Sequence, residues 1–176
     1  PMIESLDHVI VVVRDLAAAA RSVRSLLGRS HSWRGSHPAY GTENVLFRVA
    51  NTYLELLSPV GPGPLAEGLR SRLDAEGEGL AGLAFATADA AALATALRAR
   101  GIEASEPQPG LGRDDENGAF RRWYNVLIPR EATRGVGLFA IQHETPPEVL
   151  PLAQPIAPVE ACVAAQRAKP AGRPEP

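Results

Sequence analysis

LDHVIVVVRDL, residues 6–16, opens a unit that the chain repeats, because LAGLAFATADA at residues 80–90 has a closely similar pattern of apolar and acidic positions. Each stretch is followed by an alanine-rich run that reaches a glycine, Gly28 in the first copy and Gly101 in the second. The copies are too large and too few for a solenoid, so they predict two modules that face each other around a cavity. The largest difference between the copies is His8 against Gly82.

Apolar periodicity predicts a strand followed by a helix in both copies. Residues 3–14 are rich in valine and isoleucine and predict a buried strand, after which Asp15 can cap a helix that stops at Gly28. Residues 80–88 and a helix capped by Asp89 repeat this order. Further apolar runs predict strands at 45–50, 52–58, 118–128 and 136–143.

These elements divide the chain into four segments. We expect a first βαβββ module at 3–58, a connector with a helix at 59–78, a second βαβββ module at 79–147 and a Pro-rich C-terminal extension, partly flexible, at 148–176. The predicted fold class is therefore α+β, with paired βαβββ modules.

Composition excludes several classes of partner. The 176 residues carry 18 Lys and Arg against 20 Asp and Glu, so there is no overall basic field for nucleic acid. No stretch approaches the roughly 20 apolar residues that cross a bilayer, so we expect no membrane partner. Cys162 is the single cysteine, which leaves no intrachain disulfide and favours a cytoplasmic protein.

Four strings, taken in order, resemble the vicinal oxygen chelate superfamily and, within it, the glyoxalase-like branch. They are LDHVIVVVRDL, HPAYGTEN leading into YLELL, GRDDENGAFRRW and LFAIQHETP, and the resemblance covers residues 3–147. It implies paired βαβββ modules whose mixed sheets curl around a shared cavity. It also implies a divalent metal at the bottom of that cavity, with Zn, Mn, Ni, Co and Fe as the candidates.

His8 and Glu55 match the two metal-ligand positions of the first module in this resemblance. On its own, His8 is better explained as a hydrogen-bonded polar residue of a buried strand. Glu55 stands inside the apolar string YLELL, where an unpaired charge is costly to bury, so it needs a cation, a proton or a hydrogen-bond donor. The two residues together favour a site over a coincidence.

The second module departs from the ligand pattern of the family. Gly82 stands at one ligand position and has no side chain to offer. Aligning Ser58-Pro59 with Thr145-Pro146 places Gln142 opposite Glu55, and strand alternation then turns His143 to the other face unless a bulge reverses the choice. The implied metal ligands are His8, Glu55 and Gln142. One imidazole and one carboxylate are few ligands for a tightly held transition metal, and an amide oxygen is a weak one.

Substrate contacts are expected from loops and from the second module. The resemblance favours His37 and Asn44 as substrate-binding residues, although turn chemistry alone would also explain their loop. Arg113 could hold a substrate carboxylate beside Trp123, but it also fits a solvated arginine in a polar loop. One residue of the pair Arg121 and Arg122 should face the cavity, and alternation does not say which.

The first functional hypothesis is a metal-dependent isomerase or lyase that acts on a small oxygenated metabolite. The metal would act as a Lewis acid, and His143 and His37 are the candidates for catalytic proton transfer. A dioxygenase is disfavoured, because only one histidine is in register for a facial triad. A homodimer is the default expectation for sheets of this shape.

The alternative is a metal-free protein that binds or sequesters a small planar molecule. Gly82 favours it, and four aromatic residues would then supply the contact surface: Trp33, Tyr53, Trp123 and Phe139. A third possibility is a regulatory or scaffolding module whose site is vestigial.

Overall fold

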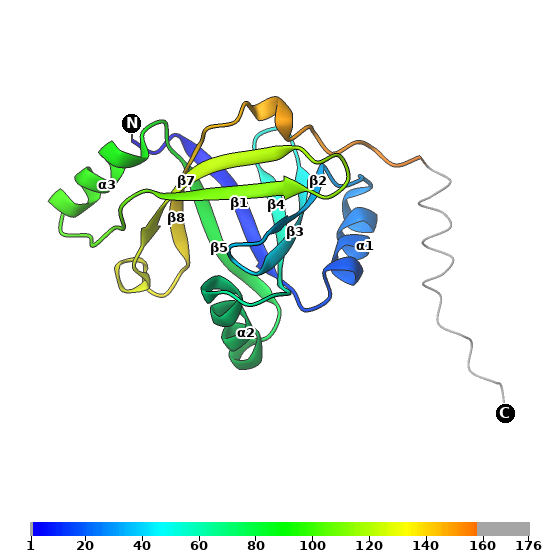
Figure 1. Cartoon of the computed structure of the whole chain (residues 1–176), viewed down its shortest axis with the longest axis horizontal. Helices are drawn as coiled ribbons and strands as arrows, with labels where there is room; N and C mark the ends of the chain where they lie inside the picture. The colour runs from blue at the N-terminus through cyan, green and yellow to red at the C-terminus, as the bar shows by residue number, and fades with distance from the viewer. Residues whose placement is uncertain (1, 158–176) are drawn as a thin grey trace.

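The computed structural model describes residues 2–157, in which eight strands close into one barrel and three α-helices lie against its outside (Figure 1). The elements of the first half are β1 (Ser5–Val12), α1 (Leu16–Leu27), β2 (Trp33–His37), β3 (Thr42–Arg48) and β4 (Tyr53–Pro59). After α2 (Pro64–Glu76) come β5 (Gly79–Ala86), α3 (Ala90–Ala99), β6 (Gln108–Asp114), β7 (Phe120–Ile128) and β8 (Leu138–His143). Two short 3-10 helices, η1 (Arg130–Thr133) and η2 (Pro147–Val149), flank β8.

The predicted flexibility of the 148–176 extension concerns mainly residues 158–176, which lie outside the described residues. Within residues 2–157, no helix is long and apolar enough to cross a membrane.

The strand order around the barrel is β1-β4-β3-β2-β6-β7-β8-β5. Each half therefore contributes four neighbouring strands, and the halves join through two antiparallel pairs, β1 with β5 and β2 with β6. The pairs β1–β4 and β5–β8 are parallel, so the sheet is mixed. The predicted fold class, paired βαβββ modules with mixed sheets curled around a cavity, is confirmed.

The first helix of each half begins in the same way. The Asp15 carboxylate accepts a hydrogen bond from the Ala18 amide at 2.9 Å, and the Asp89 carboxylate accepts one from the Ala92 amide at 2.9 Å. Each cap satisfies one of the amide donors that a helix N-terminus leaves without a partner. The predicted start of both helices is thus correct, and it fixes where each helix turns back onto its sheet.

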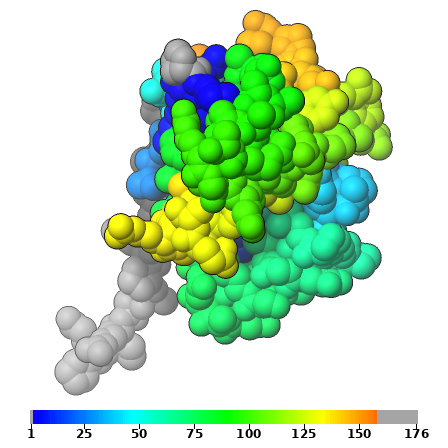
Figure 2. All heavy atoms as spheres, turned by 90° about the vertical axis from the view of Figure 1, so that its left-hand side faces the viewer, coloured from blue at the N-terminus to red at the C-terminus, as the bar shows by residue number. Residues whose placement is uncertain are grey.

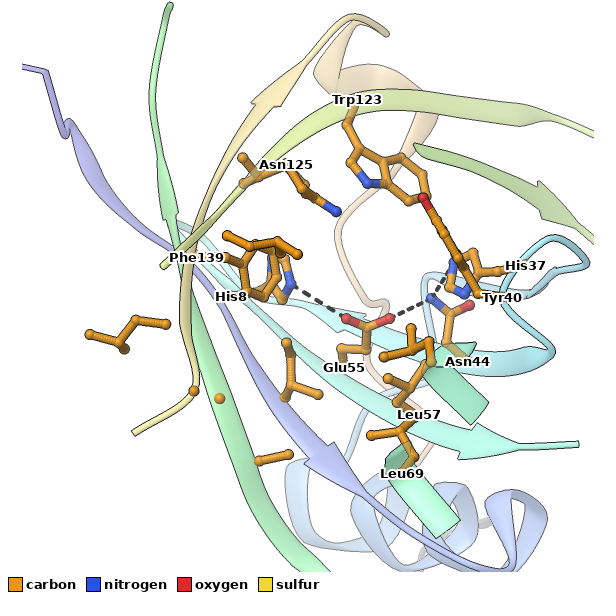
Figure 3. A pocket seen from close by; sticks show the side chains of 18 of the residues that line it. His8, His37, Tyr40, Asn44, Glu55, Leu57, Leu69, Trp123, Asn125 and Phe139 are labelled. Atoms are coloured by element: carbon orange, nitrogen blue, oxygen red, sulfur yellow. Dashed lines mark hydrogen bonds and ion pairs between the residues drawn. The ribbon is translucent and has the colours of Figure 1, made fainter. Parts of the chain in front are cut away.

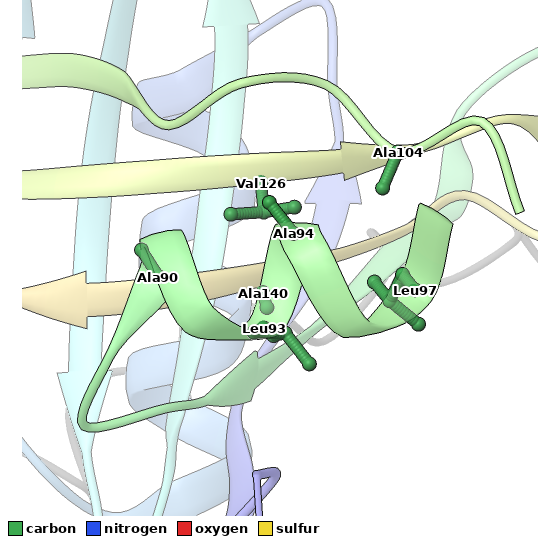
Figure 4. Packing of buried hydrophobic residues seen from close by; sticks show 7 residues of the cluster. All are labelled: Ala90, Leu93, Ala94, Leu97, Ala104, Val126 and Ala140. Carbon is green, nitrogen blue, oxygen red and sulfur yellow. The ribbon is translucent and has the colours of Figure 1, made fainter. Parts of the chain in front are cut away.

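The helices cover the outer face of the barrel, which leaves its interior free. Figure 4 shows α3 lying over β7 and β8, where Leu93 and Ala94 pack against Val126 and Ala140. Burial of a side chain such as Leu93 contributes about 1.5–3 kcal/mol. On the other half, α1 packs in the same way through Leu16 against β3 and β4.

Apolar periodicity did not identify the two strands at the junction, β2 and β6. Their inward positions include Gly35, Gly110 and Gly112, so they lack the apolar alternation of a half-buried strand. The glycines serve close packing. A Cβ at Gly110 would lie 2.1 Å from Nε1 of Trp123, so the indole ring can cross β6 only at a residue without a side chain.

Candidate active site

A cavity of about 400 Å³ fills one end of the barrel interior and opens between α2 and the segment that joins β7 to β8, which lie one above the other in Figure 2. Most of its wall is apolar, including Ile10, Leu57, Leu69, Phe139 and Ile141. Polar side chains gather in one part of the wall. Such a cavity is typical of a small-molecule site, in which a few polar groups orient a ligand inside an apolar pocket.

A continuous polar row crosses the four strands of the first half, one residue from each (Figure 3). His8 on β1 places Nε2 3.4 Å from Oε2 of Glu55 on β4. Oε1 of Glu55 accepts a hydrogen bond from Nδ2 of Asn44 on β3 at 2.7 Å. The same Nδ2 lies 3.4 Å from Nε2 of His37 on β2. All four residues line the cavity, so the structure brings together His8, Glu55, Asn44 and His37 as a single site.

Asp7 lies behind this row and joins it to a second, smaller cavity. Its Oδ1 is 2.6 Å from Nδ1 of His8, and its Oδ2 is 3.1 Å from Nε2 of His143. A carboxylate on the far nitrogen fixes the orientation of the His8 ring, as carboxylates do for functional histidines elsewhere. Tyr53 stacks on the same ring with centroids 4.4 Å apart. His8 is therefore held on one ring face by Tyr53 and at its two nitrogens by Asp7 and Glu55.

The charged neighbours of His8 and Glu55 shift the pKa values of both side chains. Burial opposes a charge on His8, but the hydrogen bonds and charges of Asp7 and Glu55 outweigh it and raise the pKa of the imidazole above 6.5. Burial likewise opposes ionisation of Glu55, yet the hydrogen bond and charge of His8 lower the pKa of its carboxyl to about 2. The pair therefore persists as an imidazolium facing a carboxylate to a higher pH than an unpaired imidazole would allow.

The pKa of His37 is shifted in the opposite direction to that of His8, although both residues line the same cavity. Burial lowers the pKa of its imidazole below 6.5, and the positive charge of Arg121 acts in the same direction while Glu55 opposes it. Its Nδ1 lies 3.0 Å from Oγ1 of Thr42. His37 is therefore neutral at pH 7 and offers a ring nitrogen on the side of Asn44.

The register shows which residues of the second half correspond to His8 and Glu55. The Val13 amide donates to the Leu57 carbonyl at 3.0 Å, and the Thr87 amide donates to the Ile141 carbonyl at 3.0 Å, which makes these two pairs equivalent. Counting back from them, Gly82 corresponds to His8 and Phe139 corresponds to Glu55. The predicted alignment of Gln142 with Glu55 is wrong by three residues.

Gln142 therefore lies on the outer face of β8. Its Oε1 accepts a hydrogen bond from the Ala90 amide at 2.8 Å, at the first turn of α3, and it does not line the cavity. His143 lies on the opposite face, as alternation requires, but it lines the smaller cavity beyond Tyr53. The structure thus contradicts the placement of Gln142 among metal ligands, and it places His143 outside the main cavity.

The residues present do not fit a tightly held divalent metal. Two donors face each other, His8 Nε2 and the Glu55 carboxylate, and no group of three His, Cys, Asp or Glu side chains in residues 2–157 is arranged to hold a metal ion. Metal sites of this kind use three or four protein ligands. At Gly82 a Cβ would lie 2.7 Å from the Gly137 carbonyl oxygen, and at the other position the Phe139 ring packs edge-on against His8 at 5.6 Å.

Of the predicted substrate contacts, the structure places Trp123 in the cavity but not Arg113. Arg113 lies on β6 between the inward positions Gly112 and Asp114, so its exposed side chain points out of the barrel. The stretch was expected to be a loop, and its being a strand is what turns the side chain away. Arg121, two residues before Trp123 on β7, is the arginine that faces inward. Trp33 is buried in the core, and the cavity lining does not include it.

The sequence matches the glyoxalase-like domain over residues 6–172, nearly the whole chain. The chain belongs to the glyoxalase-like domain family. This membership confirms the predicted relation to the vicinal oxygen chelate superfamily, whose barrel of paired βαβββ modules the structure shows.

Known relatives of this glyoxalase-like protein include epimerases. Over 66 residues it is 39% identical to the ethylmalonyl-CoA/methylmalonyl-CoA epimerase of Cereibacter sphaeroides, a stretch that is 37% of this chain and 49% of the epimerase. The chain thus spans about half the length of the curated relative that it matches.

Solved structures of two further epimerases share the fold. Methylmalonyl-CoA epimerase from Mycobacterium tuberculosis superposes with a TM-score of 0.65 at 22% identity, covering 80% of this chain and 89% of that one. A methylmalonyl-CoA epimerase bound to methylmalonyl-CoA and NH4+ gives a TM-score of 0.64 at 20% identity, over 81% and 96% of the two chains. At these identities the likeness is one of fold.

Proposed function

We propose that this glyoxalase-like protein is an isomerase that moves a proton on a small oxygenated substrate, with His37 as the base and His8 as the acid. The observation that carries the proposal is that two imidazoles line one cavity and have pKa values displaced in opposite directions. Pairs of titratable groups whose pKa values are pushed apart are typical of acid–base catalysts.

The proposed step uses a neutral and a charged imidazole. His37 takes a proton from a carbon next to a carbonyl group, and the electron pair of the broken C–H bond moves into the carbonyl to form an enolate. His8 donates its Nε2 proton to the enolate oxygen, while the Glu55 carboxylate remains charged. The enol proton then returns to His8, and the proton on His37 returns to the opposite face of the same carbon after the enol has turned in the cavity, which forms the epimer with no net change in protons.

The relatives support the class of reaction. The curated relative and the two solved structures cited above are named as epimerases, and epimerisation is a proton transfer at carbon. A metal-dependent version of the proposal would need ligands at Gly82 and Phe139, which neither residue supplies. We therefore assign the stabilisation of the enolate oxygen to the His8 imidazolium.

The second candidate function is the metal-free binding protein. The largely apolar wall and the ring faces of Trp123 and Phe139 favour it, because such a surface retains planar ligands without any chemistry. The two candidates differ in turnover, since a binding protein would not exchange substrate protons with the solvent.

Proton exchange in D2O, followed by NMR, tests the proposal directly. The probes are methylmalonyl-CoA, 2-oxobutyrate and dihydroxyacetone, each of which has a hydrogen on a carbon next to a carbonyl group. We expect the wild-type protein to exchange that hydrogen in at least one probe, and His37→Gln to lower the rate by roughly 10²–10⁴-fold. The wild-type rate should peak near neutral pH, where His37 has lost its proton and His8 has kept one.

The matched control is His31→Gln, since His31 lies outside the cavity beside Glu116 and should leave the rate unchanged. A wild-type rate in His37→Gln, or no exchange in any of the three probes, would contradict the proposal. Binding of the probes without exchange would favour the alternative.

A further inference from the structure

Arg121 is a buried cation without an acidic partner among residues 2–157. The residue is 8% exposed and projects inward from β7 on the same face as Trp123. Within residues 2–157, no Asp or Glu oxygen lies within 4.0 Å of its guanidinium nitrogens. One side-chain hydrogen bond, to the Tyr53 hydroxyl at 3.4 Å, is long and neutral. Buried charges in proteins are nearly always paired, so Arg121 calls for an anion.

The aromatic residues around Arg121 hold its guanidinium group in place to bind a planar anion. The guanidinium carbon lies 5.7 Å from the ring centroid of Trp33 and 5.3 Å from that of Tyr53, in cation–π contact with both. Of the five N–H donors of the guanidinium group, the residues that the structure describes engage one in a side-chain hydrogen bond, the Nη2 donor to the Tyr53 hydroxyl. The donors lie in the plane of the group and match the two oxygens of a carboxylate.

The position of Arg121 also gives a ligand access to it. Arg121 and Tyr53 line both the main cavity and a smaller cavity of about 210 Å³ beside it. A ligand whose body occupies the main cavity can therefore reach the guanidinium group without unfolding the barrel. The exposed arginines Arg113 and Arg122 offer no such site, because their side chains point away from the barrel interior.

Two buried amide oxygens of cavity-lining residues lack donors within residues 2–157. Oδ1 of Asn44 and Oδ1 of Asn125 have no hydrogen-bond partner in the part of the chain that the structure describes. The orientation of Asn44 is fixed, because its Nδ2 donates to Glu55 at 2.7 Å. Figure 3 shows Asn125 projecting from β7 into the cavity, on the side opposite Asn44. A ligand with an O–H or N–H group would satisfy these acceptors, whose isolation is otherwise unfavourable.

We propose that Arg121 binds the carboxylate of the substrate, and that the substrate is a small carboxylic acid with a hydroxyl or other donor for Asn44 or Asn125. The inference rests on the proposed function, to which it adds the substrate class. It makes Arg121 the residue that orients the substrate between His8 and His37. A 2-hydroxy acid has the required groups, and so has the enol form of a 2-oxo acid, which carries a carboxylate and a hydroxyl group.

Calorimetric binding of three probes of similar shape tests the inference. Phenylacetate and phenylacetamide differ in the carboxylate, and mandelate adds a hydroxyl group to phenylacetate. Wild-type protein should bind phenylacetate roughly 10–100-fold more tightly than phenylacetamide, and mandelate more tightly still. Arg121→Met should remove the preference for the acid and leave the affinity for the amide within about threefold, which also shows that the variant is folded.

The control variant is Arg122→Met, which changes the adjacent residue on the opposite face of β7 and should retain the full preference. Equal affinity of wild-type protein for the acid and the amide, absence of binding by both acids, or an undiminished preference in Arg121→Met would overturn the inference. Failure of the isomerase proposal looks different: the acid preference would persist, but no probe would exchange protons in D2O.

Discussion

Glu55→Gln should change how the stability of the protein depends on pH. The pKa of the Glu55 carboxyl is about 2 in the folded chain against an ordinary value of 4.5. Because the folded pKa is the lower one, this carboxylate stabilises the fold fully above pH 4.5 and loses that effect as the pH falls toward 2. At about 1.4 kcal/mol for each pKa unit, ionisation of Glu55 contributes about 3 kcal/mol at pH 5.5 and about 1 kcal/mol at pH 3.

Glutamine cannot ionise, so this part of the pH dependence should disappear in the variant. The difference in free energy of unfolding between wild type and Glu55→Gln should shrink by about 2 kcal/mol from pH 5.5 to pH 3. Urea unfolding followed by tryptophan fluorescence measures it at both pH values, at which His8 is protonated in the folded chain.

The control for this experiment is Glu131→Gln, an exposed side chain whose substitution should shift stability by less than about 0.5 kcal/mol at either pH. A difference between wild type and Glu55→Gln that stays constant from pH 5.5 to pH 3 would refute the reasoning. In that case the His8–Glu55 ion pair does not hold the carboxyl in its charged form.

The other predictions concern packing and capping. Gly110→Ala places a methyl group 2.1 Å from Nε1 of Trp123, so the indole must move; we expect a shifted fluorescence maximum and a loss of about 1–3 kcal/mol in urea unfolding. Gly68→Ala is its control, since the added Cβ in α2 contacts nothing within 4 Å and should stabilise the protein by about 0.5–1 kcal/mol. Gln142→Ala removes the acceptor of the Ala90 amide and should lower the free energy of unfolding by about 1 kcal/mol, while proton exchange in D2O stays at the wild-type rate. A slower exchange in this variant would show that Gln142 takes part in the active site.

The sequence predicted the parts of the fold that local physics determines. Asp15 and Asp89 each precede an apolar helical stripe, and both cap a helix in the structure. Strands with β-branched inward positions, such as β1, were equally predictable. Strands β2 and β6 were not, because their pairing closes the barrel between distant segments. Their inward glycines follow from the bulk of Trp33 in β2 and of Trp123 against β6, rather than from any strand preference.

The candidate site was predicted in its first half and misplaced in its second. His8 and Glu55 lie together as the resemblance implied. Gln142 was misplaced because Ser58-Pro59 forms the end of β4, whereas Thr145-Pro146 lies beyond the end of β8, so aligning the two prolines shifted the register by three residues. Alignment of Leu54 with Leu138 would have placed Phe139 opposite Glu55.

Arg121 was left undecided between two neighbours, although strand alternation could have resolved it. Trp123 occupies the cavity, and a residue two positions away on the same strand must face the same side. That no acidic residue of the described part of the chain pairs with Arg121 could not be predicted, because its neighbours come from β4 and β2, which only the folded barrel brings together.

The central claim is that two imidazoles, rather than a metal, carry the proton transfer. The measurement that tests it most directly is D2O exchange of the three carbonyl probes on protein purified without chelator, with its metal content determined by elemental mass spectrometry on the same sample. The account predicts exchange by protein that holds well under one equivalent of divalent metal, with loss of exchange in His37→Gln. One equivalent of divalent metal that disappears in Glu55→Ala together with the exchange would contradict it.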